Sequence, residues 1–291
     1  MRPIGSSAMV RGPPTALVHC APFEALVAMR ERTPFPRSLL TRLPNLRLLV
    51  TTGARNAAID VAAAGALGIT VSGTEGLPYP TAELTWALIL ALARQVPAED
   101  RALRSGDWQT SVGTGLHGKT LAVLGLGRLG TQVARIGRAF GMRVIAWSPN
   151  LTPARAESGG AELVSRDELF RQADVLSIHL VLSERTRALV GARELALLKK
   201  SALLINTSRG PIVDERALGA ALSSGALGGA GLDVFEIEPL PANHPFLASK
   251  NTVLTPHLGY VTAETYRIFY TQALEDIRGY LDGKPLRLIA V

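Results

Sequence analysis

A glycine motif between an apolar strand and a helix constrains the fold of this chain most strongly. Residues Thr120 to Gly130 read Thr-Leu-Ala-Val-Leu-Gly-Leu-Gly-Arg-Leu-Gly. The pattern predicts a helix from Thr131 to Phe140 and a second strand from Arg143 to Trp147, so the motif lies inside a βαβ unit. In that context the first glycine permits a tight turn, the second a close backbone approach and the third close packing of helix on strand. A pyrophosphate can then bind at the helix N-terminus, where free N–H groups and the helix dipole attract it.

The length and composition allow two domains and argue against several classes of partner. The chain has 291 residues, enough for two hydrophobic cores. Its net charge is +7, but the arginines are scattered, so a cleft for a small anionic substrate fits better than a nucleic-acid arm. The longest apolar run, Leu84 to Ala93, is too short to span a bilayer. We therefore expect no nucleic-acid or membrane partner. The single cysteine, Cys20, favours a cytoplasmic location because one cysteine permits no internal disulfide.

Strands and helices alternate along the chain after a lead-in over residues 1–14 that is rich in Gly and Pro and is expected to be disordered. Thr81 to Arg94 is apolar nearly all round, which predicts a buried helix between two α/β blocks. The other predicted helices are Ser38–Leu43, Ala57–Leu67, Asp167–Gln172, Arg193–Leu198 and one capped by Asp214 that ends at Gly225. The other predicted strands are Leu46–Thr51, Ile69–Ser72, Val175–Leu180, Ala202–Thr207, Gly231–Phe235 and Thr252–Thr255. This spacing predicts an α/β fold with a doubly wound parallel sheet.

Ligands of such sheets bind beyond the carboxyl ends of the strands, so the polar groups at those ends are candidates for chemistry. Three of them, Arg209, Glu238 and His257, form a consistent set. A nicotinamide cofactor needs a partner group that moves a proton, and a histidine beside a carboxylate suits this task. An arginine can hold a substrate carboxylate in a bidentate fork. Taken singly, each residue also has an ordinary interpretation: a turn histidine, a surface cation and a solvated loop carboxylate.

Four motifs in order then resemble the signatures of the D-isomer-specific 2-hydroxyacid dehydrogenases. They are Gly125-Leu-Gly-Arg-Leu-Gly130, Asn206-Thr-Ser-Arg-Gly-Pro-Ile-Val-Asp-Glu215, Gly231-Leu-Asp-Val-Phe-Glu-Ile-Glu-Pro-Leu240 and Thr255-Pro-His-Leu-Gly259. The resemblance implies a Rossmann dinucleotide-binding domain (residues 86–262) inserted into a smaller flavodoxin-like substrate domain (residues 1–85 and 263–291). It implies that the helix Ala263–Leu281 returns to the first domain, and that the domains close over substrate.

The resemblance also implies a role for each matching residue. Arg209 matches the arginine that binds the substrate carboxylate, and Glu238 and His257 match the acid/base pair. The implied cofactor residues are Gly125, Gly127, Arg128, Leu129, Gly130, Ser148, His179, Thr207, Asp233 and His257, with Asp233 beside the nicotinamide. The implied substrate residues, besides Arg209, are Arg30, Arg32, Gly53, Ala54 and Arg55. On a strand, Arg30 and Arg32 would share a face, although two solvated surface arginines are an equal alternative. We expect no metal site, because the other histidines lack ligand spacing.

The sequence departs from the family pattern at two places. Ser148 stands where an acidic residue would bind the ribose hydroxyls and repel a 2′-phosphate, so NADP stays open. We favour NAD, because no arginine follows until Arg155 and a phosphate without a cation would lose its charge-assisted bonds. At the N-terminus the family's first strand is missing or replaced by the lead-in. This predicts an incomplete first sheet with an exposed edge, from a shortened paralogue or a misassigned start.

These features together predict a cytoplasmic NAD(P)-dependent oxidoreductase that interconverts a D-2-hydroxy acid and its 2-oxo acid. The resemblance implies a homodimer formed through the dinucleotide domain, and the apolar helix at Leu84–Ala93 fits a buried dimer element. The alternative is a cofactor-sensing regulatory protein similar to the C-terminal-binding-protein corepressors. A third possibility is an enzyme that shares the site but acts on a phosphonate or phosphoglycerate.

Overall fold

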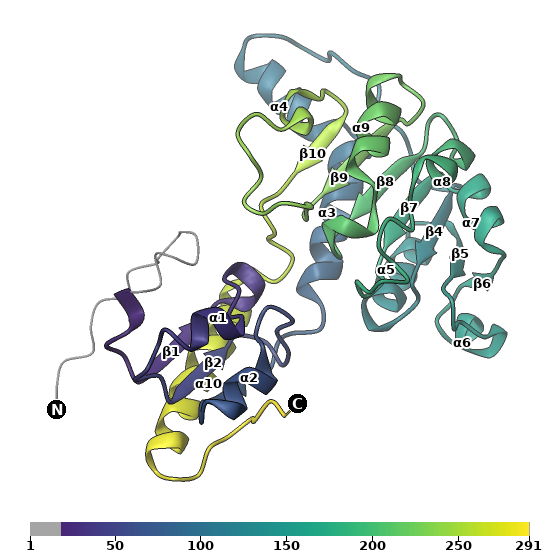
Figure 1. Ribbon diagram of the computed structural model, residues 1–291. Helices are drawn as coiled ribbons and strands as arrows, with labels where there is room; N and C mark the ends of the chain where they lie inside the picture. The colour runs from purple at the N-terminus through teal and green to yellow at the C-terminus, as the bar shows by residue number, and fades with distance from the viewer. Residues whose placement is uncertain (1–18, 291) are drawn as a thin grey trace. The chain divides into compact units, whose positions relative to one another are not determined.

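A computed structural model describes residues 19–290 (Figure 1), so the lead-in and its expected disorder lie outside the described residues. The chain divides into two compact units. The first consists of Met1–Leu77 and Thr262–Val291, and the second of Pro78–Val261. Helix α3 (Pro80–Ala93) lies whole in the second unit, whereas the expected boundary after residue 85 would divide it. Among the helices of residues 19–290, none is both long and apolar enough to cross a membrane.

The second unit is built on a seven-stranded sheet with the order β10-β9-β8-β7-β4-β5-β6, in which every neighbouring pair is parallel. The strand order reverses at β4, which pairs with both β5 and β7, so the prediction of a doubly wound sheet is confirmed. The strands are β4 (Thr120–Leu124), β5 (Arg143–Trp147), β6 (Glu162–Leu163), β7 (Val175–Ile178), β8 (Leu203–Asn206), β9 (Gly229–Leu232) and β10 (Thr252–Leu254).

Helices cover this sheet and bury two apolar clusters. One cluster includes Phe170, Leu195 and Leu218, and the other includes Trp86 and Ile89 of α3. The remaining helices are α4 (Val96–Arg104), α5 (Arg128–Ala139), α6 (Pro153–Ser158), α7 (Arg166–Gln172), α8 (Ala192–Leu197) and α9 (Glu215–Ser223), with the 3₁₀ helices η3 (Gly210–Ile212) and η4 (Pro245–Ala248). The predicted cap of α9 is confirmed, because Asp214 Oδ1 accepts from the N–H groups of Arg216 and Ala217 at 3.0 Å each.

The first unit contains a parallel sheet with the order β1-β2-β3. Its elements are β1 (Ala25–Ala28), β2 (Leu48–Thr51), β3 (Thr70–Gly73), α1 (Arg37–Leu40), α2 (Val61–Ala66) and α10 (Ala263–Leu281). The predicted C-terminal helix is confirmed, and its Ala273 packs on Leu48 and Val50 of β2. The prediction of a missing first strand concerns residues before 19 and lies outside the described part of the chain.

One expectation for this unit is wrong. Arg30 and Arg32 do not share the face of a strand, because β1 ends at Ala28 and both arginines lie in a 3₁₀ helix, η2 (Arg30–Arg32). The backbone turns sharply at Arg30, whose φ is 49°. In a helix with about three residues per turn, residues two apart point in different directions.

Candidate active site

The glycine motif forms the turn between β4 and α5. Gly125 has a φ of +103°, a left-handed conformation that favours glycine, and a β-carbon there would lie 2.7 Å from the His179 carbonyl oxygen. A β-carbon on Gly130 would overlap the Gly125 carbonyl. Gly127 differs: it is the N-cap of α5, and a β-carbon there would meet no atom within 4 Å. The motif therefore leaves free space at the start of a helix, which fits the pyrophosphate of a dinucleotide.

This contrast gives a matched pair of variants. Gly127→Ala is expected to fold with an unchanged melting temperature but to bind NADH at least about tenfold more weakly, because the methyl group occupies the free space at the helix N-terminus. Gly130→Ala is expected to lower the melting temperature as well, since its methyl group must displace backbone. Thermal unfolding and a fluorescence titration with NADH measure both effects. Undiminished NADH affinity in Gly127→Ala would argue against a pyrophosphate at this turn.

The loop after β10 is held by a buried carboxylate. Asp233, fully buried at the end of β9, accepts hydrogen bonds from Thr255 Oγ1 (2.6 Å), Leu258 N (2.7 Å) and Gly259 N (2.8 Å). Its carbonyl also accepts from His257 N at 2.8 Å. Burial raises the pKa of Asp233, and the three hydrogen bonds to its carboxyl group oppose that rise. These bonds fix His257 in a left-handed conformation with a φ of 56°, which is uncommon for a residue with a side chain.

The His257 imidazole meets the carboxylate of Glu238. The distance from Nδ1 to Glu238 Oε2 is 2.6 Å, and the two side chains are 23% and 34% exposed, so the pair is accessible to a ligand. Glu238 Oε1 accepts from Phe235 N at 3.0 Å, which fixes the carboxylate on its own loop. Burial alone would raise the pKa of Glu238, but the hydrogen bond and charge of His257 bring it below its ordinary value, with smaller contributions from the Phe235 N–H and the charge of Arg209. An ionised Glu238 stabilises a protonated imidazole.

Arg209 lies on the turn after β8, the strand next to β9. Asn206 brackets this turn: its side-chain amide donates to the Arg209 carbonyl at 3.0 Å and its oxygen accepts from Ser208 N at 3.0 Å. The Arg209 side chain is half-buried and donates from Nη1 to the Ser208 carbonyl at 2.7 Å. Because its charge lowers the pKa of Glu238, the guanidinium lies within electrostatic reach of the His257–Glu238 pair.

The other predicted cofactor residues also lie at the carboxyl ends of the strands. Ser148 follows β5, and His179 follows β7 with its ring Nε2 2.8 Å from Ser177 Oγ. Burial lowers the pKa of His179 to about 4, so this imidazole is neutral at physiological pH. Thr207 follows β8, and its hydroxyl is 2.8 Å from that of Thr85 on α3. Arg128 and Leu129 form the first turn of α5.

The predicted substrate residues of the first unit form a local cluster. The guanidinium of Arg30 occupies the space that a β-carbon on Gly53 would take, and the Gly53 N–H donates to Thr74 Oγ1 at 2.8 Å. Asn56 connects the two segments, since its amide donates to the Arg30 carbonyl at 2.7 Å and to Thr51 Oγ1 at 2.9 Å. Ala54, Arg55 and Arg32 are all exposed.

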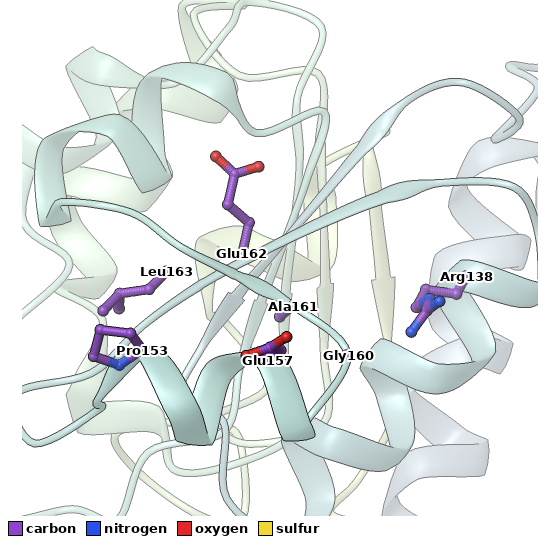
Figure 2. A pocket seen from close by; sticks show the side chains of 7 residues that line it. All are labelled: Arg138, Pro153, Glu157, Gly160, Ala161, Glu162 and Leu163. Atoms are coloured by element: carbon purple, nitrogen blue, oxygen red, sulfur yellow. The ribbon is translucent and has the colours of Figure 1, made fainter.

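A surface hollow elsewhere in the second unit contains none of these residues. Figure 2 shows it beside α6 and β6, with a volume of about 560 Å³. It is lined by Arg138, Pro153, Glu157, Gly160, Ala161, Glu162 and Leu163. Two carboxylates and one guanidinium do not favour an anionic ligand, so we place the candidate site at the strand ends instead.

Comparisons with known proteins show the family of this chain. Residues 86–259 match the family model of the D-isomer specific 2-hydroxyacid dehydrogenase NAD binding domain. A glyoxylate reductase from Aeropyrum pernix is 46% identical over 256 residues, which cover 84% of this chain and 76% of the relative. This chain belongs to the D-isomer-specific 2-hydroxyacid dehydrogenases. A D-3-phosphoglycerate dehydrogenase from Methanocaldococcus jannaschii is 38% identical over 89% of this chain, which spans only 50% of that dehydrogenase's length.

A solved member of the family has the same fold. The crystal structure of a phosphoglycerate oxidoreductase from Vibrio cholerae matches with a TM-score of 0.89 and 38% identity, over 93% of this chain and 88% of that one. The predicted family is therefore confirmed, and so is the predicted fold, a Rossmann domain combined with a smaller α/β substrate domain.

Sequence reasoning missed Asn206 as a site residue. It is 1% exposed and shapes the Arg209 turn, and the available signal was a polar residue that ends an otherwise apolar strand. It also assigned Asp233 only to the cofactor, whereas in the structure Asp233 accepts four hydrogen bonds from the His257 loop.

Proposed function

We propose that this chain catalyses the NAD-dependent interconversion of a small D-2-hydroxy acid and its 2-oxo acid. The observation that carries the proposal is the 2.6 Å contact between His257 and Glu238, within electrostatic reach of Arg209, in a member of this dehydrogenase family. Relatives named glyoxylate reductase and D-3-phosphoglycerate dehydrogenase support this class of reaction. The cytoplasmic location expected from the single cysteine stays a prediction.

In this proposal each residue has a separate task. Nicotinamide, when bound, supplies the hydride that C2 of the 2-oxo acid receives. Arg209 holds the substrate carboxylate, and His257 donates a proton to the oxygen of the C2 carbonyl while Glu238 stabilises the imidazolium. Because Nδ1 of His257 faces Glu238, the proton is given from Nε2. In the reverse direction His257 removes the hydroxyl proton of the 2-hydroxy acid.

A panel of substrates tests this function. NADH oxidation is measured with glyoxylate and pyruvate, and NAD reduction with D-3-phosphoglycerate and D-lactate. We expect turnover with at least one of these acids. Dinucleotide binding without any turnover would contradict the proposed activity and would favour the cofactor-sensing alternative instead.

We further propose that NAD is the preferred dinucleotide. Ser148 offers a hydroxyl but no charge at the end of β5, and the nearest arginine after it, Arg155, lies in α6. We expect wild-type protein to bind NADH more tightly than NADPH. Ser148→Asp is expected to weaken NADPH binding by a further tenfold or more, about the effect of one unfavourable charge, while NADH binding is retained. Dissociation constants for both dinucleotides measure this, with Ser148→Ala as the neutral control. Tighter NADPH than NADH binding in the wild type would contradict the NAD preference.

We also propose a homodimer through the second unit, as expected, but not through the apolar run Leu84–Ala93. The side chains of Leu88 and Ile89 in α3 are buried within their own unit, so the apolar run at 84–93 offers little to a partner. Beside it, α4 and the following loop expose Val96 (54%), Leu103 (58%) and Trp108 (77%). Large exposed apolar side chains gathered on one element are typical of a protein interface. Sedimentation velocity measures the oligomeric state.

A further inference from the structure

A second histidine–glutamate pair, His244 and Glu215, contacts the loop that carries Glu238. Glu215, the first residue of α9, has one carboxylate oxygen 3.3 Å from Nε2 of His244. Its other oxygen accepts a hydrogen bond from the backbone N–H of Glu236 at 2.6 Å. Glu236 lies two residues before Glu238, on the loop that carries the carboxylate to His257. Glu215 therefore links α9 to the loop of the acid/base pair.

The contact with His244 fixes the orientation of the Glu215 carboxylate. The Nδ1 atom of His244 accepts a hydrogen bond from Phe246 N at 3.3 Å, so Nε2 carries the proton and can donate it to Glu215. The imidazole also packs against the buried ring of Phe246, with the ring centroids 4.7 Å apart. The side chains of His244 and Glu215 are only 19% and 14% exposed, so solvent competes little for this contact.

The same loop is also pressed against the arginine turn. Gly210 directly follows Arg209, and a β-carbon built on Gly210 would overlap the peptide between Phe235 and Glu236. Two loops from the neighbouring strands β8 and β9 thus lie in backbone contact, and the hydrogen bond from Glu236 N to Glu215 attaches the second loop to α9 as well.

We propose that Glu215, oriented by His244, is a positioning residue that holds the Phe235–Glu238 loop so that Glu238 meets His257. The inference rests on the proposed function for its effect on turnover, but the loop contact itself is independent of substrate. An ordinary interpretation is that Glu215 only stabilises the N-terminus of α9 through the helix dipole. That interpretation predicts an effect on stability alone.

Glu215→Ala separates the two interpretations. We expect kcat for 2-oxo acid reduction to fall by about tenfold or more, because a small misplacement of a catalytic group is costly, while the NADH dissociation constant is unchanged. The alkaline limb of the reduction profile is expected to move to lower pH, since an imidazolium that loses its carboxylate releases its proton more readily. Glu215→Gln keeps one acceptor oxygen and is expected to lie between wild type and Glu215→Ala.

Asp214→Ala is the matched control. It removes the N-cap of the same helix but leaves the contact from Glu215 to Glu236, so it is expected to lower the melting temperature with kcat and the pH profile unchanged. Equal losses of kcat in Glu215→Ala and Asp214→Ala, or no loss in Glu215→Ala, would overturn the proposal.

Amide hydrogen exchange of residues 235–238 gives a readout that needs no substrate. Faster exchange in Glu215→Ala than in Asp214→Ala supports the positioning role, and unchanged exchange overturns it. If the wild type turns over no acid, the proposed function fails, yet the exchange measurement still decides whether Glu215 holds this loop.

Discussion

Replacing His257 with alanine is expected to lower kcat for 2-oxo acid reduction by about 10²–10⁴-fold, the usual contribution of a positioned acid/base group. The physical reason is that the His257 imidazole, held 2.6 Å from the Glu238 carboxylate, is the group placed to donate the proton. Binding of NADH is expected to persist, because the glycine turn lies on a different strand from the His257 loop. Stopped-flow or steady-state kinetics with the best acid of the panel, together with an NADH titration, measure the two effects separately.

His117→Ala is the control for this prediction, since His117 is exposed and outside the candidate site. Its turnover is expected to equal that of the wild type. Glu238→Gln is expected to lower kcat less than His257→Ala does. The imidazole remains in this variant, but the carboxylate charge that stabilises its protonated form is removed. Turnover in His257→Ala within a few-fold of wild type would remove His257 from the role of proton donor.

Replacing Arg209 with alanine is expected to lower kcat/KM by about 10²–10³-fold, the range seen when one preorganised donor to a reacting group is removed. The loss arises because the substrate carboxylate loses its bidentate partner and the carbonyl is no longer aligned with His257. Arg209→Lys is expected to recover only part of the loss, since an ammonium group keeps the charge but not the planar fork. Steady-state kinetics over a range of acid concentrations give kcat and KM for each variant.

Arg216→Ala is the matched control, because Arg216 is an exposed arginine seven positions along the same segment. Its kcat/KM is expected to be unchanged. Equal values for Arg209→Ala and Arg216→Ala would show that Arg209 does not bind the substrate.

Sequence reasoning predicted the second unit well because local signals there agree with the tertiary structure. The glycine turn needs a left-handed conformation at Gly125 and the absence of a β-carbon at Gly130. Glycine meets both requirements, so the sequence itself shows them. The strands are continuous apolar runs, as expected for a parallel sheet covered on both faces. The two-residue strand β6 and the short helix α6 were not predicted, because neither is long enough to show a periodic pattern.

The parts that sequence reasoning could not predict depend on contacts between distant residues. Asp233 fixes the backbone of Leu258, 25 positions away, and Glu215 binds the backbone of Glu236, 21 positions away. Side chain to backbone bonds of this kind leave no spacing rule in the sequence. Arg30 and Arg32 were misjudged for a local reason, since the strand before them is only four residues long and ends in a 3₁₀ turn.

The configuration of the reduced product tests the proposed chemistry most directly. A prochiral 2-oxo acid such as pyruvate or 3-phosphohydroxypyruvate is incubated with NADH and the protein, and the 2-hydroxy acid formed is resolved by chiral chromatography. We expect stoichiometric NADH oxidation with the D enantiomer of the 2-hydroxy acid as the only product. We expect His257→Ala to lose this product formation. An L or racemic product, or no turnover of any 2-oxo acid by protein that demonstrably binds NADH, would contradict a D-2-hydroxyacid dehydrogenase built on His257, Glu238 and Arg209.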